Sequence, residues 1–271
     1  MRVKDVAAPT RIESLAMNTA FLRAATVLAI FGAQVAAPAF AAAPCTATSG
    51  ATAPVVVELY TSEGCDSCPP ADRWLSKTIA ERSKDAGFIA LAYHVDYWDY
   101  LGWKDAFAQP AFTQRQSSLA AKGGASGVYT PQIFVNGKDD RSWIGGAARL
   151  ASAGRATVKF TVTSNWTGEG AALALGVTGK VTETASGLRL RYAVTENGLI
   201  NAVKAGENRG VTLRHDAVVR AAGALPLDAS GAFALNVPLP RAIRQGNSQL
   251  HVIAEDARGN PLAAATISCA S

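Results

Sequence analysis

Apolar and polar positions between residues 54 and 154 alternate in a way that predicts both strands and helices. The β-branched run 55–60 and the apolar run 88–95 are typical of buried strands. Between them, residues 69–86 follow helical spacing, and Pro70 suits the first turn of a helix. A strand, a helix and a second strand in this order predict a βαβ unit with parallel strands and a right-handed crossover.

The other elements of this first part follow from further apolar runs and from turn residues. Asn136-Gly137 is a strong hairpin signal after an apolar run, and Gly145-Gly146 precedes an apolar stretch. The further elements expected here are a helix over 106–122, a strand over 132–135, a returning strand over 141–144 and a helix from 145 to about 153.

Residues 156–271 lack long helical patterns. Leu188, Leu190 and Tyr192 alternate with other residues, as a half-buried strand requires. Many short strands with frequent turns favour an antiparallel sandwich. The pattern therefore predicts an α/β domain with a mixed sheet over 54–154, followed by an all-β, sandwich-like domain over 156–271. The strands expected in this second domain cover residues 158–163, 171–177, 188–194, 211–219, 233–237, 250–254 and 262–268.

Composition restricts the class of protein. The chain of 271 residues is 49% apolar and 17% charged, which excludes intrinsic disorder. Of the net charge of +5, residues 1–41 carry +2, because they hold four basic and two acidic side chains. The remaining residues show no Lys/Arg-rich run along the sequence, so we expect no nucleic-acid partner.

The N-terminal segment has the features of an export signal. Arg23 precedes the Ala-rich apolar stretch 24–37, and Ala39 and Ala41 follow it. This order is typical of a secretory signal peptide over residues 1–41. An uncleaved membrane anchor is the alternative, because the apolar run reaches about 20 residues. We expect a secreted or periplasmic protein that has no membrane association after cleavage.

The motif Cys65-Asp66-Ser67-Cys68 follows an expected strand and precedes an expected helix. Two cysteines one helical turn apart can close a small disulfide ring, and the helix N-terminus favours a thiolate at the first of them. Redox chemistry is therefore the first interpretation. An inert disulfide and half of a zinc site are the alternatives; the further zinc ligands available are Cys45, Cys269, His94, His215 and His251.

Several motifs together resemble the thioredoxin/glutaredoxin fold: C-x-x-C at a helix start, T-P-Q-I-F-V-N-G, and a later Gly-Gly. The resemblance covers about 100 residues and implies an α/β thioredoxin-like domain. It implies that Pro131 is a cis-proline beside the reactive cysteine and that Thr130 offers its backbone to a substrate strand. An ordinary trans proline in a loop is the alternative.

A closer resemblance covers nearly all of the exported chain. The segments V-E-L-Y-T-S-E-G-C-D-S-C-P-P-A-D and H-V-D-Y-W-D-Y-L-G-W-K-D resemble a secreted bacterial family of unknown function, DUF1223. This resemblance implies a thioredoxin-like domain joined to a C-terminal β-rich part. Because the biochemical function of the family is not established, the resemblance bears on fold and export more than on activity.

Three polar residues are candidate proton relays. Glu58 lies in the first strand, one residue farther from C-x-x-C than the relay acid of thioredoxins. Because strand side chains alternate between faces, Glu58 is either a relay or a solvated strand residue. His94 and Asp96 end the second parallel strand, where the carboxyl ends of strands share a crevice. They either assist Cys65 or are ordinary loop residues.

More than one interpretation stays open for the remaining cysteines, histidines and aromatic residues. Cys45 and Cys269, near the two mature termini, are expected to form a structural disulfide; two free thiols or an intermolecular bond are the alternatives. His215 and His251 lie on expected strands and are either structural residues or ligands. Four aromatic residues form either a packed lid or a ligand platform: Tyr97, Trp98, Tyr100 and Trp103.

The sequence thus favours a thiol–disulfide oxidoreductase-like protein with Cys65 as nucleophile and Cys68 as resolving cysteine. Glu63 and Asp66 disfavour the Cys65 thiolate and hence a strongly oxidising couple. The expected substrate is a protein or small thiol, with no cofactor and no bound metal; the oligomeric state stays open. A binding module with a permanent disulfide and a copper-handling protein are the alternatives.

Overall fold

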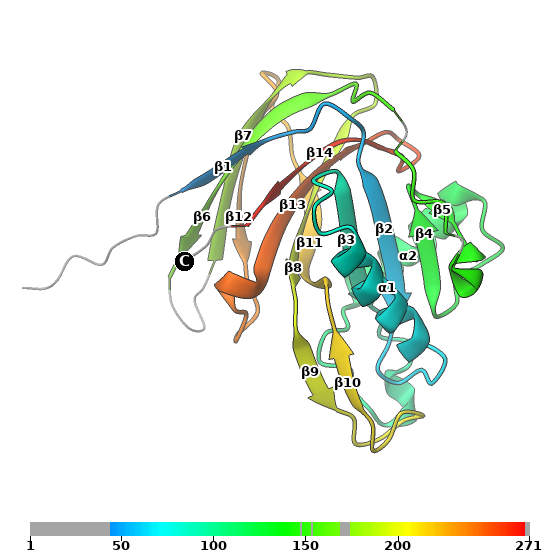
Figure 1. The fold of residues 1–271 in the computed structure, drawn as a ribbon. Helices are drawn as coiled ribbons and strands as arrows, with labels where there is room; N and C mark the ends of the chain where they lie inside the picture. The colour runs from blue at the N-terminus through cyan, green and yellow to red at the C-terminus, as the bar shows by residue number, and fades with distance from the viewer. Residues whose placement is uncertain (1–43, 147, 153, 169–173, 269–271) are drawn as a thin grey trace, which may run out of the picture. The chain divides into compact units, whose positions relative to one another are not determined.

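The computed structural model describes residues 44–146, 148–152, 154–168 and 174–268. The expected signal peptide, residues 1–41, lies outside the described residues. Figure 1 shows mainly strands, with two α-helices, α1 (Pro69–Glu81) and α2 (Pro110–Gly123). None of the described helices has the length and apolar composition needed to cross a membrane.

The largest sheet has eight strands, and they come from both ends of the described chain. Their spatial order is β14 (Pro261–Ile267), β13 (Ser248–Glu255), β8 (Arg189–Glu196), β11 (Val218–Leu225), β3 (Phe88–His94), β2 (Val55–Thr61), β4 (Gln132–Val135) and β5 (Lys138–Asp139).

A four-stranded antiparallel sheet and a separate hairpin complete the strands (Figure 1). The four strands, in spatial order, are β1 (Cys45–Thr48), β6 (Lys159–Thr167), β7 (Ala174–Glu183) and β12 (Ala232–Pro238). The hairpin consists of β9 (Leu199–Ala202) and β10 (Thr212–His215). Short 3-10 turns cover η1 (Asp99–Leu101), η2 (Ser142–Gly145) and η4 (Gln245–Asn247).

The predicted βαβ unit is confirmed. Strands β2 and β3 are parallel, and α1 connects them. Helix α1 begins with two prolines, which need no N–H partner in the first turn. Its buried residues Ala71 and Leu75 pack against Val57 and Leu59 of β2. The alternate residues of β2 face the opposite side of the sheet, where Tyr60 belongs to the same core cluster as residues of α2.

The expected fold class is wrong. We expected an α/β thioredoxin-like domain followed by an all-β, sandwich-like domain, but strands from both parts form one sheet. Strand β11 pairs with β3 in parallel, with Val218 opposite Ala92, and β8, β13 and β14 continue the sheet from there. The described chain is therefore mostly β, and its two helices lie against a sheet that both parts share.

The physical reason lies in the composition of β3. All its residues after Phe88 are buried, and an exposed edge strand of this kind would present unpaired backbone groups beside apolar side chains. Contact with β11 covers that edge at Ala92. One core cluster accordingly joins Tyr60 and Tyr93 of the first part to Ala193 and Ile253 of the second.

The Asn136-Gly137 turn is confirmed, but three further elements of the first part differ from expectation. The returning strand is β5, Lys138–Asp139, rather than residues 141–144, and residues 148–152 contain no helix. The Asp140 carboxylate accepts hydrogen bonds from the backbone and hydroxyl groups of Ser142, which favours a local turn there. Helix α2 begins at Pro110 rather than 106, since the residue before a proline favours extended backbone.

Candidate functional site

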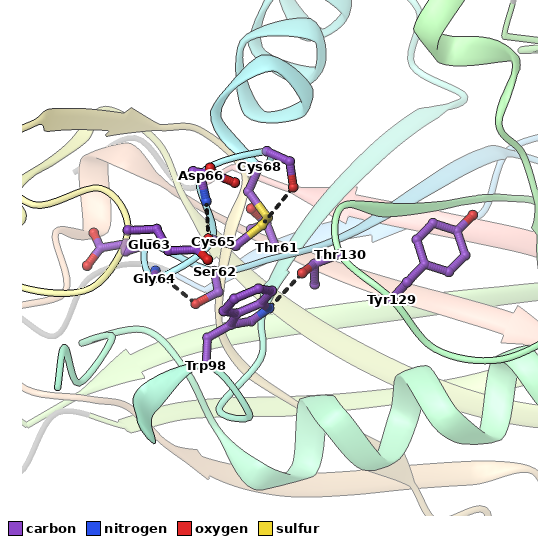
Figure 2. Close-up of a disulfide and its surroundings, with 12 residues drawn as sticks. Thr61, Ser62, Glu63, Gly64, Cys65, Asp66, Cys68, Trp98, Tyr129 and Thr130 are labelled. Atoms are coloured by element: carbon purple, nitrogen blue, oxygen red, sulfur yellow. Dashed lines mark hydrogen bonds between the residues drawn. A yellow bond between two sulfur atoms is a disulfide. The ribbon is translucent and has the colours of Figure 1, made fainter. Parts of the chain in front are cut away.

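Cys65 and Cys68 form a disulfide at the start of α1, as the motif predicts (Figure 2). Their Cα atoms are 5.5 Å apart. Cys68 is the N-cap residue of the helix, and its carbonyl accepts the backbone N–H groups of Ala71 and Asp72. Both cysteines are 0% exposed, although Asp66 between them is exposed. The sulfur atoms therefore lie beneath a surface loop rather than at the surface.

The loop between β9 and β10 holds the C-x-x-C loop in place. The buried Asn208 amide donates hydrogen bonds to two carbonyls, those of Glu63 at 2.9 Å and Cys65 at 2.8 Å. The neighbouring Glu207 carboxylate accepts the backbone N–H of Asp66 at 3.0 Å. The second part of the chain thus supplies the residues that fasten the loop carrying the disulfide.

Trp98 lies on another side of this loop. Its indole N–H donates to the Thr130 hydroxyl at 2.7 Å, as Figure 2 shows. A Cβ atom on Gly64 would lie only 3.1 Å from the Trp98 Cβ, so the loop and the tryptophan pack closely. Among the other expected lid aromatics, Trp103 donates to Glu63 at 2.8 Å, whereas Tyr100 is 78% exposed.

The peptide bond between Thr130 and Pro131 is cis, as the resemblance implied. Pro131 directly precedes β4, which pairs with β2. Trp98 links Thr130 to the disulfide loop, because it donates a hydrogen bond to Thr130 and also packs against Gly64. The roles expected for Thr130 and Pro131 in binding a substrate stay predictions.

A cluster of buried ionisable side chains adjoins the disulfide loop, and we call it the histidine–carboxylate cluster. It combines residues of the disulfide loop, α1, β3, the loop after η1, and β10. Its five members are Glu63, Asp72, His94, Asp105 and His215.

Hydrogen bonds and ion pairs connect these residues. Nδ1 of His94 lies 2.7 Å from Asp105, whose same carboxylate oxygen accepts the backbone N–H of Glu63 at 2.9 Å. Nε2 of His215 lies 3.3 Å from Glu63. Its Nδ1 is 3.8 Å from Asp72, an ion-pair distance that is too long for a hydrogen bond. The two imidazole rings meet edge to face, with centroids 4.9 Å apart.

The charge state of the cluster follows from these contacts. Burial lowers the pKa of His215, but the carboxylates of Asp72 and Glu63 outweigh it and raise the pKa to about 9. Burial raises the pKa of Asp105, but His94 and backbone N–H groups outweigh it, so that this pKa is lowered. His215 is therefore a buried imidazolium at neutral pH, directly linked to the loop that carries Cys65.

The other expected relay residues lie elsewhere. Glu58 accepts two hydrogen bonds of 2.7 Å from Arg115 of α2 and one of 2.9 Å from Arg191 of β8. Burial raises its pKa, but these arginines outweigh it and lower the pKa to about 2. Asp96 accepts a hydrogen bond from Thr113. Of the three expected relay residues, only His94 belongs to the histidine–carboxylate cluster.

Sequence reasoning missed the roles of Asp72, Asp105 and Asn208, and it left His215 undecided. One signal for His215 exists, because Leu213 and His215 share the buried face of an alternating strand. A histidine at such a position needs a polar partner. Nothing local indicates Asn208, since its partners come from the other part of the chain.

Three further expectations concern His251, a bound metal and a second disulfide. His251 is buried between Thr195 and Thr266, and its ring nitrogens lie 3.1 and 2.9 Å from their hydroxyls. Within the described ranges, no group of three or more His, Cys, Asp or Glu side chains is arranged to hold a metal ion. Cys45 begins β1, but Cys269 lies outside the described residues, and so does the bridge expected between them.

Two solved structures are similar to this chain. The protein AGR_C_4864 from Agrobacterium tumefaciens matches with 28% identity and a TM-score of 0.48, over 79% of this chain and 92% of that chain. HBP35 of Porphyromonas gingivalis matches with 18% identity and a TM-score of 0.53, over 81% of this chain and 76% of that chain. The second match is a likeness of fold alone.

None of the curated proteins compared with the chain matches it. A family model does match, over residues 56–255, which include the disulfide, the histidine–carboxylate cluster and strands of both sheets. The match runs across the boundary expected between two domains, in keeping with the shared eight-stranded sheet. The chain therefore belongs to the family described as protein of unknown function, DUF1223.

Proposed function

We propose that this protein is an exported thiol–disulfide oxidoreductase in which Cys65 is the nucleophile and Cys68 the resolving cysteine. The observation that carries the proposal is the buried histidine–carboxylate cluster beside the Cys65–Cys68 disulfide. A disulfide that only braces a loop needs no buried titratable groups, and such groups are costly unless paired. The N-terminal segment supports export, to a compartment where disulfides persist.

The reaction begins with the reduced protein. The Cys65 thiolate attacks a substrate disulfide, forming a mixed disulfide, and the departing substrate sulfur takes the electron pair and then a proton. Cys68 loses its proton and attacks the Cys65 sulfur. The second substrate sulfur leaves with the electron pair of the mixed disulfide and takes up a proton, and the observed Cys65–Cys68 bond closes. The substrate is reduced by two electrons, and the protein is oxidised by two.

Protons must enter and leave a site that solvent does not reach. Asp72 lies one helical turn after Cys68, on the same face of α1, and accepts a hydrogen bond from Thr61 at 3.0 Å. His215 contacts Asp72 and is protonated at neutral pH. We therefore assign Asp72 as the acceptor of the Cys68 proton, because His215 already carries its own.

The balance of charge supports a reducing couple. The helix N-terminus favours a thiolate. Against it stand the three carboxylates of the histidine–carboxylate cluster, which the His215 imidazolium cannot fully neutralise. A disfavoured thiolate shifts the equilibrium towards the disulfide form, so electrons flow from this protein to its substrate.

The test is a redox titration of the mature protein. Equilibration in graded thiol buffers, followed by alkylation and peptide mass spectrometry, reports the fraction of reduced Cys65 and Cys68. We expect a reversible two-electron transition between roughly −120 and −270 mV, nearer the reducing end. Protection of both cysteines well below roughly −300 mV, with the fold intact, would falsify the proposal.

A second candidate is a binding module whose disulfide is permanent. The observation in its favour is the complete burial of both cysteines beneath the Asn208 contacts. The same titration separates the two functions, because a permanent disulfide stays oxidised in every buffer in which the protein remains folded.

A further inference from the structure

A groove of about 1390 Å³ lies at the other end of β4 from the disulfide. Strand β4 pairs with β2 from Gln132, opposite Tyr60 near the disulfide loop, to Val135, opposite Val57. Its lining residues lie beyond Val135, at the end of α2, in the β4–β5 turn and in the β13–β14 turn, among other places. Figure 1 shows where these elements lie. It shares no lining residue with the histidine–carboxylate cluster.

Basic side chains dominate this groove. Five of its lining residues are exposed cations drawn from four places in the chain: Lys122, Lys138, Arg141, Arg149 and Arg258. Of these five, only Arg141 has a carboxylate within ion-pair distance among the described residues, namely Asp139 at 3.7 Å.

The two acidic residues of the groove are already engaged by the protein. Asp139 accepts hydrogen bonds from Tyr129 at 2.8 Å and Gln132 at 3.3 Å. Asp140 accepts the backbone N–H groups of Ser142 and Arg149. These hydrogen bonds hold both carboxylates in place but leave their charges, so five cations face two carboxylates and the groove has an excess of positive charge.

The groove is also preformed. Gly137 has φ 79°, and a Cβ there would lie 2.9 Å from the carbonyl oxygen of Gly259. A Cβ on Gly123 would lie 2.6 Å from the carbonyl oxygen of Gly137. The end of α2 and the two turns thus meet backbone to backbone, which fixes the backbone positions of Lys122, Lys138 and Arg258 and limits the entropy lost when a ligand binds.

We propose that this groove binds an acidic, extended peptide segment of a partner protein. Neighbouring β5 is the last strand of the eight-stranded sheet, and an extended segment can lie along such an edge with its carboxylates facing the cations. None of the lining residues is aromatic, and single-stranded nucleic acids bind to aromatic stacking surfaces. The charge and the sheet edge therefore favour a peptide.

The test uses fluorescence anisotropy with the mature protein and a labelled eight-residue peptide that alternates glutamate with threonine. A peptide with glutamine in place of glutamate is the neutral control. We expect saturable binding of the acidic peptide at 50 mM salt, weakening steeply as salt is raised. The neutral peptide is expected to bind at least tenfold more weakly.

Three double variants serve to locate the binding site. K138E with R258E reverses two groove cations, and we expect at least tenfold weaker binding of the acidic peptide. K180E with R189E makes the same charge change at exposed positions outside the groove and is expected to keep wild-type affinity. K122Q with R149Q repeats the test without charge reversal, should the first variant fail to fold by circular dichroism.

Three results would each overturn the proposal. They are absence of binding at 50 mM salt, equal weakening by the two charge-reversal variants, and a single-stranded oligonucleotide that binds the groove more tightly than the peptide. The redox titration of Cys65 and Cys68 is independent of all three results. If the groove binds no peptide, the proposed oxidoreductase function is unaffected; if the titration contradicts the oxidoreductase, peptide binding by the groove is unaffected.

Discussion

Two buried ionic clusters lie against the same large sheet, and they differ in the kind of cation that they contain. On the α2 side, Glu58 and Glu255 are paired with the guanidinium groups of Arg115 and Arg191 at 2.7 to 2.9 Å. In the histidine–carboxylate cluster, the bases are imidazoles. Both clusters join the two parts of the chain, because Arg191 comes from β8 and His215 from β10.

The comparison indicates that the two clusters have different roles. Two arginines balance two glutamates, and arginine keeps its charge at every pH at which the protein folds. The pKa of His215, at about 9, lies in a pH range in which a histidine can still lose its proton, and the buried Nε2 of His94 and Nδ1 of His215 make no hydrogen bond among the described residues. The arginine cluster is built to stay charged, whereas the histidine–carboxylate cluster is able to exchange protons.

The largest expected effect is the loss of stability when the cluster of Glu58, Glu255, Arg115 and Arg191, the arginine cluster, loses one arginine. R191M removes a partner of Glu58 and of Glu255 and leaves buried negative charge with fewer partners. We expect the free energy of unfolding to fall by about 3–5 kcal/mol, measured by urea denaturation. The matched control is R189M, an exposed arginine on the same strand, with an expected change within about 0.5 kcal/mol. If the free energy of unfolding of R191M fell by less than about 1 kcal/mol, a structural role for Arg191 would be contradicted.

The second prediction concerns His215 and pH. Its folded pKa of about 9 lies above the ordinary value of 6.5. The protonated His215 therefore stabilises the folded protein fully below pH 6.5, and this contribution to the free energy of unfolding is lost as pH rises towards 9. We expect the stability difference between wild type and H215Q to shrink by about 3 kcal/mol across this window, measured by urea denaturation at several pH values.

A second histidine provides the control for that experiment. Burial and Arg191 lower the pKa of His251 to about 3, so this residue stays neutral between pH 6.5 and 9. The difference between wild type and H251Q is accordingly expected to be flat over the same window. Equal slopes in the two variants would mean that His215 is not the titrating group.

The smallest expected effect concerns access to the disulfide. N208A removes both hydrogen bonds that hold the C-x-x-C loop, at a cost of about 1–2 kcal/mol to the closed arrangement. We expect dithiothreitol to reduce the Cys65–Cys68 disulfide several-fold faster, measured by timed alkylation. N236A, an exposed asparagine on β12, is the control and should leave the rate unchanged. An unchanged rate in N208A would show that Asn208 does not limit access.

Local features were predictable from the sequence. The parallel β2–α1–β3 unit, the Asn136-Gly137 turn and the Cys65–Cys68 disulfide each follow from residues close together in the chain. The cis bond before Pro131 was also expected, through family resemblance. Each of these features is specified within a few residues or by one connection.

Features that depend on distant segments were not predictable. The hairpin of β9 and β10 encloses a long loop, and no pattern in that loop shows that Asn208 will meet Cys65. The five cations of the groove are scattered along the chain, so no basic run announced them. The expected division into an α/β and a β part failed for the same reason, since only pairing in space reveals the shared sheet.

The parallel contact of β3 with β11 has a consequence for synthesis. Ala92 is made long before Val218, its partner, so the apolar strand β3 must wait for most of the chain before its second neighbour exists. Contacts between distant segments form slowly. The central sheet can therefore be completed only after most of the chain has been made.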